Sequence, residues 1–287
     1  MEIIQPEVQG TAETPLIVIT PHSSTYITKE FQSSLAISES EVRRFTDMYT
    51  DELFGEVVNL GGVLIPGSVS RFVVQLNKKT EVRDGRLYVW DKKLTDIVDA
   101  DPKNPDSSFI RYSWTGNKIM EPEMTEREMM EIYEAVYQPF FAAIDKAVAE
   151  AQEKFGYSVL IDGHSFPSVS ADGERKHADF VLGTRDWTTA DVDLIYRAVH
   201  ALLERASKVG IDMYEWNGGY TTAHYSRMAG KRKGFDPKKA NALQIETNKN
   251  KYMDEKTFKK SSDFAKTKDH ISYWLEEVES KIISIKN

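Results

Sequence analysis

The chain has 287 residues, with 45 acidic and 37 basic side chains, six histidines and no cysteine. The formal net charge of −8 argues against a general nucleic-acid binder, because neutralising phosphates needs a basic surface. The absence of cysteine excludes a disulfide scaffold, a thiolate zinc site, an iron–sulfur centre and a cysteine nucleophile.

Four segments in the first half of the chain predict regular structure. In chain order they are a strand, a helix and two strands: 16–20, 38 to about 60, 63–65 and 72–76. The first is an apolar, β-branched run, typical of a strand buried on both faces. The helix is expected to stop at Gly61 and Gly62. The polar, turn-rich stretch from about 78 to 123 is expected to be a long insertion loop, and such loops tend to be functional.

Six segments in the second half continue the alternation. They are a helix, two strands, a helix, a strand and a helix: about 125–154, 157–162, 180–183, about 190–209, 242–246 and from about 263. Strands that alternate with helices predict an α/β fold with a mixed, mostly parallel sheet flanked by helices. We expect residues 1–287 to form a single domain with the insertion loop inside it.

The sequence indicates neither a membrane segment nor an export signal. No stretch approaches the roughly 20 consecutive apolar residues that a membrane helix needs. The N-terminus has no basic start and no apolar core, so we do not expect a signal peptide. We therefore expect a cytoplasmic protein with no membrane or nucleic-acid partner, and the sequence leaves the oligomeric state open.

Two histidines follow predicted strands. Ligands of such sheets bind beyond the carboxyl ends of the strands, where the sequence places His22 and His164. Without cysteine, a zinc site must use imidazole and carboxylate ligands. Asp47 and Asp51 are four residues apart and would share one face of the predicted helix, so either could supply the carboxylate. The alternatives are a core or surface role for each histidine and a solvated helix flank for each aspartate.

Other polar residues stand at strand ends or in a glycine-rich loop. Asn77 follows one predicted strand, and Glu246 closes another, where a buried carboxylate would be costly. Beside a metal ion, Glu246 could be the general base for a metal-bound water, and an ion pair with a nearby lysine is the alternative. His224 lies in the aromatic and glycine-rich segment 218–225, which could line a pocket.

Seven short segments together resemble the N-formylglutamate amidohydrolase family. They occur in the family's order and span about residues 15–280: Pro21-His22-Ser23; Thr46-Asp47 with Asp51-Glu52-Leu53-Phe54; Ser70-Arg71-Phe72-Val73-Val74-Gln75-Leu76-Asn77; Asp162-Gly163-His164-Ser165; Asp179-Phe180-Val181-Leu182-Gly183-Thr184; Gly218-Gly219-Tyr220 with His224-Tyr225; and Ala242-Leu243-Gln244-Ile245-Glu246 with Tyr252-Met253-Asp254-Glu255. Each segment alone is a weak signal, and the specificity comes from their order.

The resemblance implies a zinc-dependent amidohydrolase with the phosphorylase/hydrolase-like fold shared by zinc carboxypeptidases and aspartoacylases. It implies that His22 and His164 are zinc ligands. The carboxypeptidase pattern has a glutamate three residues after the first histidine, where this chain has Thr25. We therefore expect Asp47 to be the third ligand, with Asp51 as the second choice.

The resemblance also implies roles for residues around the metal ion. Glu246 matches the general acid and base, and Arg71 matches the arginine that polarises the scissile carbonyl and holds the oxyanion. Asn77 matches a residue that binds the substrate carboxylate. His224 and Tyr225 are expected to line the substrate pocket.

The chain departs from the family's Asp-Leu-Asn-Arg pattern at two positions. Gln75 stands in place of the aspartate, and Lys78 stands in place of the arginine. A lysine can still meet the substrate carboxylate, but as a point charge and not as a bidentate fork. The expected reaction is hydrolysis of the amide bond of an N-formyl or N-acyl amino acid, a small anionic substrate, by metal-activated water.

Two alternatives to this function remain at the level of sequence. One is a zinc carboxypeptidase or another deacylase with the same fold. The other is a non-catalytic binding protein that keeps the fold with an altered site, which the changes at Gln75 and Lys78 would suit.

Overall fold

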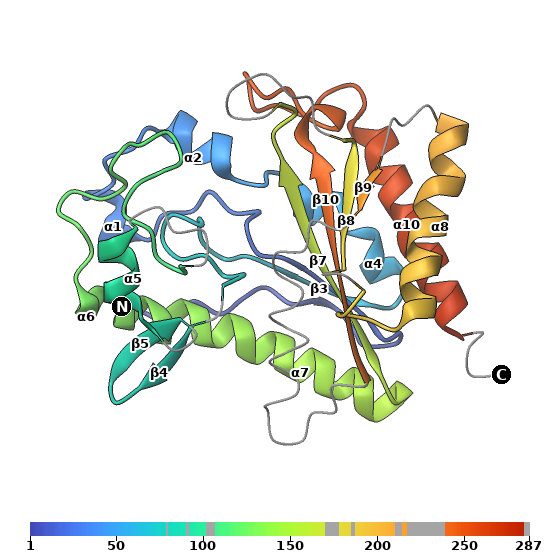
Figure 1. Ribbon diagram of the computed structural model, residues 1–287, viewed down its shortest axis with the longest axis horizontal. Helices are drawn as coiled ribbons and strands as arrows, with labels where there is room; N and C mark the ends of the chain where they lie inside the picture. The colour runs from blue at the N-terminus through green and yellow to red at the C-terminus, as the bar shows by residue number, and fades with distance from the viewer. Residues whose placement is uncertain are drawn as a thin grey trace. The chain divides into compact units, whose positions relative to one another are not determined.

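The main sheet has seven strands in the order β1-β3-β2-β7-β10-β8-β9 (Figure 1). The computed structural model describes residues 1–78, 80–89, 92–101, 107–169, 178–184, 187–209, 214–216 and 239–283. In chain order the strands of the main sheet are β1 (Gln9–Gly10), β2 (Leu16–Thr20), β3 (Val63–Pro66), β7 (Ser158–Phe166), β8 (Phe180–Gly183), β9 (Tyr214–Trp216) and β10 (Ala240–Asn248). A second sheet contains β4 (Glu81–Arg83), β5 (Arg86–Val89) and β6 (Lys92–Lys93).

The main sheet is mixed and mostly parallel, as predicted. β7 pairs in parallel with β2 on one side and with β10 on the other, and β8 pairs in parallel with β9. The antiparallel pairs are β10 with β8 and β1 with β3. All five residues of β2 are buried, which confirms the strand predicted from the continuous apolar run at 16–20.

Two long helices, α8 (Val192–Val209) and α10 (Phe264–Ile283), lie side by side next to the sheet (Figure 1). The indole N–H of Trp274 in α10 donates a 3.0 Å hydrogen bond to the carbonyl of Ala198 in α8. The predicted helix at 125–154 is confirmed as α6 (Glu126–Ile132), a π-helical turn (Tyr133–Tyr137) and α7 (Gln138–Phe155). In the described residues, no helix is long and apolar enough to cross a membrane.

The residues group into two compact units. The first contains residues 1–7, 21–48 and 66–143, with the three-stranded sheet and the helices α1 (Lys29–Gln32), α2 (Glu39–Phe45), α5 (Leu94–Ala100) and α6. The second contains residues 8–20, 49–65 and 144–287, with the seven-stranded sheet and the helices α3 (Thr50–Leu53), α4 (Glu56–Asn59), α8 and α10. The expectation of a single domain over the whole chain stays a prediction.

Three sequence-based expectations for the first half of the chain are wrong. The predicted helix at 38–60 is the three short helices α2, α3 and α4, because Thr46 is extended and Tyr49 is left-handed with φ 66°. The predicted strand at 72–76 is an irregular turn whose apolar side chains are buried. The stretch 78–123 is not only loop, since it carries β4, β5, β6 and α5.

Strand β7 is longer than predicted. The glycine at position 163 indicated a turn after Asp162, but the strand runs on to Phe166, so His164 lies within the strand. The glycine has a packing role, because a Cβ atom on Gly163 would lie 2.7 Å from the Phe54 ring. Glu246 likewise lies inside β10 and does not close it.

We predict that Gly163→Ala lowers the free energy of unfolding by about 1–3 kcal/mol, the usual cost of overpacking a core. Urea unfolding of the purified variant measures this. Adding Phe54→Leu should recover part of the loss, because it removes ring atoms that the new methyl group would meet. An unchanged unfolding midpoint for Gly163→Ala would contradict this account of the glycine.

Candidate metal and catalytic site

Four polar side chains share one face of the main sheet at β7 and β10. In the parallel register Asp162 pairs with Gln244, and His164 pairs with Glu246. Side chains alternate along a strand, so these residues face away from the side on which Gly163 meets Phe54. Glu246 is partly buried, and the other three are buried. Strand pairing thus collects an imidazole, two carboxyl groups and an amide on one surface.

Each of the two predicted functional residues in this group has a polar neighbour on its own strand. Asp162 Oδ1 lies 2.8 Å from His164 Nε2, and Gln244 Nε2 donates a 2.9 Å hydrogen bond to Glu246 Oε1. The amide hydrogen bond fixes one oxygen of the Glu246 carboxylate, and the Asp162 carboxyl lies against the His164 ring. No role was predicted from the sequence for Asp162 or Gln244. Their spacing of two residues from His164 and Glu246 on predicted strands was the available signal.

The structure brings His22 and Asp47 together in the first compact unit. His22 follows β2 by two residues, and Asp47 follows α2. The backbone N–H of Asp47 donates a 2.9 Å hydrogen bond to the carbonyl of His22, and Asp47 Oδ2 lies 3.6 Å from His22 Nδ1. Both residues are 2% exposed. The backbone bond between them therefore fixes a buried imidazole and a buried carboxylate next to each other.

Asp51 occupies a different element from Asp47. It lies in α3, beyond the left-handed Tyr49, so the two aspartates do not share a helix face as the sequence analysis expected. Burial raises the pKa of the Asp51 carboxyl, and backbone hydrogen bonds and the charge of Lys260 reduce this shift without cancelling it. Ionised Asp51 is therefore a cost to the folded state at neutral pH.

The remaining predicted residues lie in several places. The Arg71 guanidinium donates to the carbonyl of Phe45 and to the side chain of Gln75. Asn77 is 9% exposed, and within the described residues nothing hydrogen-bonds its Oδ1 atom. Lys78 accepts a 2.6 Å hydrogen bond from a tyrosine hydroxyl at its backbone carbonyl. His224 and Tyr225, the predicted pocket residues, lie outside the described residues.

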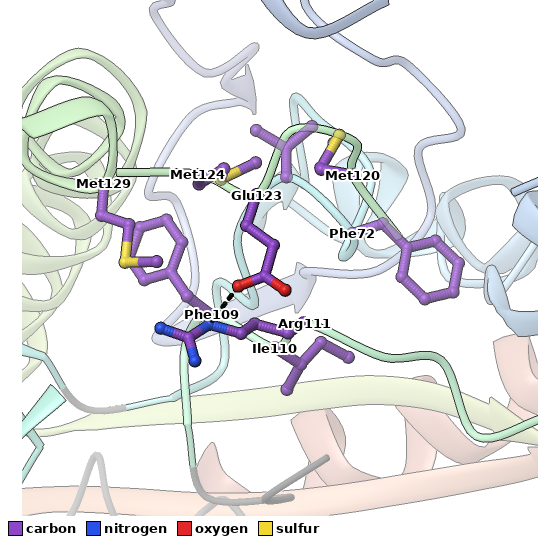
Figure 2. Close-up of a pocket in the computed structure, with 9 residues that line it drawn as sticks. Phe72, Phe109, Ile110, Arg111, Met120, Glu123, Met124 and Met129 are labelled. Atoms are coloured by element: carbon purple, nitrogen blue, oxygen red, sulfur yellow. Dashed lines mark ion pairs between the residues drawn. The ribbon is translucent and has the colours of Figure 1, made fainter. Parts of the chain in front are cut away.

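The first compact unit contains a small cavity (Figure 2). Phe72 and three methionines contribute to its lining, and Arg111 forms a 3.0 Å ion pair with Glu123 at its wall. Its volume of about 20 Å³ has room for about one water molecule. None of the predicted site residues lines it, and it is too small for an amino-acid derivative. We therefore assign it no role in substrate binding.

Comparison with known proteins shows the class of this chain. Residues 14–253 match the model of the N-formylglutamate amidohydrolase family, which is most of the chain. The protein is therefore an amidohydrolase, a hydrolase that acts on amide bonds. More narrowly, the chain belongs to the N-formylglutamate amidohydrolase family, as the resemblance of the seven segments predicted.

Individual relatives agree with this membership. The N-formylglutamate deformylase of Pseudomonas aeruginosa is 28% identical over 246 residues, which cover 84% of this chain and 83% of the relative. The N-formylglutamate deformylase of Pseudomonas putida is 25% identical over 242 residues, which cover 84% and 82%. The crystal structure of N-formylglutamate amidohydrolase from Ralstonia eutropha JMP134 has the same fold, with a TM-score of 0.78, 23% identity, and coverage of 98% of this chain and 99% of that chain.

We predict that Asp51→Asn raises the free energy of unfolding at pH 7. The folded-state pKa of Asp51 is raised, so its ionisation in the folded state costs stability as the pH rises above about 3.9, the ordinary pKa of an unfolded aspartate. The gain should shrink as the pH falls from 7 toward about 4. Urea unfolding at several pH values measures this. Asp84→Asn, in the exposed β4–β5 turn, is the control, and an equal effect of both substitutions at every pH would contradict the prediction.

Proposed function

We propose that the protein hydrolyses N-formylglutamate to formate and glutamate. The observation that carries the proposal is the family match over residues 14–253, and both curated relatives are named N-formylglutamate deformylases. The substrate is a small anion with two carboxylates and one formamide. Arg71 and Lys78 supply positive charge of the kind that such a substrate needs.

His22, Asp47 and His164 are the proposed ligands of one divalent metal ion, with zinc as the first choice. Two imidazoles and one carboxylate are a donor set that catalytic zinc uses, with a fourth position left for water. All three residues are buried, which fits ligands of a metal ion held inside the protein. Asp162 beside His164 supports the assignment, because histidines that bind metal usually contact a carboxylate or carbonyl that orients the ring. A divalent ion bound by these residues would polarise both the attacking water and the scissile carbonyl.

Glu246 is the proposed proton carrier. Its carboxylate would take a proton from the water as the water oxygen attacks the formyl carbon, while Gln244 holds Oε1 in place. Arg71 would donate hydrogen bonds to the carbonyl oxygen as negative charge develops on it. Glu246 would then return the proton to the leaving nitrogen as the C–N bond breaks. The products are formate and glutamate, which now carries a free amino group.

Asn77 is proposed to bind the N–H group and the α-carboxylate of the substrate. Its amide is buried, and Oδ1 has no hydrogen-bond partner among the described residues. An N-formyl amino acid carries an N–H group next to its α-carboxylate. One asparagine amide could therefore accept from this N–H at Oδ1 and donate to the carboxylate at Nδ2. Lys78 would add charge to the carboxylate contact.

The direct test is formate release by the purified protein. We expect release from N-formylglutamate, and slower release from N-formylglutamine, whose side chain lacks the second charge. N-acetylglutamate and a peptide with a C-terminal glutamate complete the panel. Cleavage of the peptide alone would favour the carboxypeptidase alternative, and bound metal without cleavage of any amide would favour the binding protein.

Variants should separate metal binding from proton transfer. We predict that His164→Ala loses both the bound metal and activity, because it removes a ligand. Glu246→Gln should keep the metal and lower kcat by about 10²- to 10⁴-fold, the usual contribution of a general base. Elemental analysis and formate-release kinetics on the same preparations measure the two effects.

The matched control is His200→Ala, which removes an exposed histidine on α8. It should leave both the metal content and kcat unchanged. Full metal content in His164→Ala, or full activity in Glu246→Gln, would exclude the assigned role of that residue.

A further inference from the structure

Arg71 is held on three sides within the first compact unit. Its Nη1 donates a 3.3 Å hydrogen bond to the carbonyl of Phe45, and its Nη2 donates a 3.0 Å bond to Oε1 of Gln75. The guanidinium carbon lies 4.6 Å from the centre of the Trp114 ring, within the range of a cation–π contact. Trp114 in turn packs against the rings of Phe45 and Phe72, at 5.0 and 6.0 Å between ring centres. These contacts fix both the plane and the direction of the guanidinium.

Of the residues that contact Arg71, Gln75 is itself held by hydrogen bonds to backbone carbonyls of a distant segment. It is 0% exposed, and its backbone N–H donates a 2.7 Å hydrogen bond to the carbonyl of Ser108. Its side-chain Nε2 donates a second 2.7 Å bond to the carbonyl of Ser107. The side-chain amide of Gln75 therefore donates to the Ser107 carbonyl and accepts from the Arg71 guanidinium. Only a side chain with both an acceptor and a donor can make these two bonds, and a carboxylate would place an oxygen against the Ser107 carbonyl.

We infer that Gln75 is a positioning residue for the proposed reaction, one that aims Arg71 at the scissile carbonyl through a neutral hydrogen bond. The inference rests on the proposed function, since it needs Arg71 to contact the substrate. Arginine is long and flexible, so a guanidinium that is fixed before the substrate binds loses less freedom in the transition state.

The neutrality of Gln75 matters as much as its hydrogen bond. A carboxylate at the same place, 3.0 Å from Nη2, would form an ion pair and offset part of the charge that Arg71 offers to the substrate. The amide fixes the guanidinium without adding a negative charge beside it. An anionic substrate and a developing oxyanion both benefit from this arrangement.

A double-mutant cycle tests whether Gln75 acts through Arg71. Gln75→Met keeps the length of the side chain and removes both hydrogen bonds, and we expect kcat/KM for N-formylglutamate to fall about tenfold to 100-fold. Arg71→Ala should lower it by about 10²- to 10³-fold, as for the loss of an oxyanion donor. In the Arg71→Ala background, Gln75→Met should change kcat/KM by less than about twofold, because no guanidinium remains to be positioned.

Two further variants separate positioning from folding and from charge. Thr80→Val removes another buried hydrogen bond to the same segment, from Thr80 Oγ1 to Ser108 Oγ, without touching Arg71. It should keep the kcat/KM of the wild type. Gln75→Glu keeps the shape and introduces a carboxylate, so it should lower kcat/KM in the wild type and have little effect in the Arg71→Ala background. If Gln75→Met does not fold, Gln75→Glu takes its place in the double-mutant cycle.

The outcomes are distinct. Additive effects in the cycle, wild-type kinetics for both Gln75 variants, or an equal loss in Thr80→Val would each overturn the inference. If the wild type does not cleave N-formylglutamate, the proposed function fails, and crystal structures of the wild type and a Gln75 variant then test the positioning directly. The guanidinium should leave its place over Trp114 in the variant, and an unmoved guanidinium would overturn the inference without any activity measurement.

Discussion

The parallel pairing of β7 with β10 determines which polar side chains can act together. In this register His164 lies opposite Glu246, and Asp162 lies opposite Gln244. A slip of one residue in either strand would turn its pair of side chains to the opposite face of the sheet. β2 and β8 flank the pair on its two sides and hold it inside the sheet. Gly163 allows the Phe54 ring to pack against β7 in this register, because the glycine has no side chain at that point.

Three of the functional side chains predicted from the sequence each lie against a second polar group. Asp162 lies against His164, Gln244 donates to Glu246, and Gln75 accepts from Arg71. Groups that are already in place need not rearrange during the reaction. Such preorganisation is the source of much of the electrostatic stabilisation of transition states by enzymes.

Two of the three supporting groups, Gln244 and Gln75, are neutral amides. Their neutrality matters because the protein is acidic overall. The chain carries a net charge of −8, yet the proposed substrate is an anion. Gln244 and Gln75 fix a carboxylate and a guanidinium without changing the charge of either. Neither amide adds a charge beside the proposed base or the proposed oxyanion donor, so local charge can differ from the overall balance.

The α/β class, five of the seven strands of the main sheet and the family were predictable from the sequence alone, because apolar runs, alternation and the order of short motifs are local properties. It also indicated His22, Asp47 and Glu246 through their position after or within predicted elements. Only the tertiary structure showed that Gln75 lies in an irregular segment and not in a strand, since its partners at 107–108 are more than 30 residues away in the chain. The break at Tyr49 and the continuation of β7 through Gly163 were hidden for the same reason. Backbone conformation at these points is decided by what packs against it from distant segments, and a single sequence does not display those contacts.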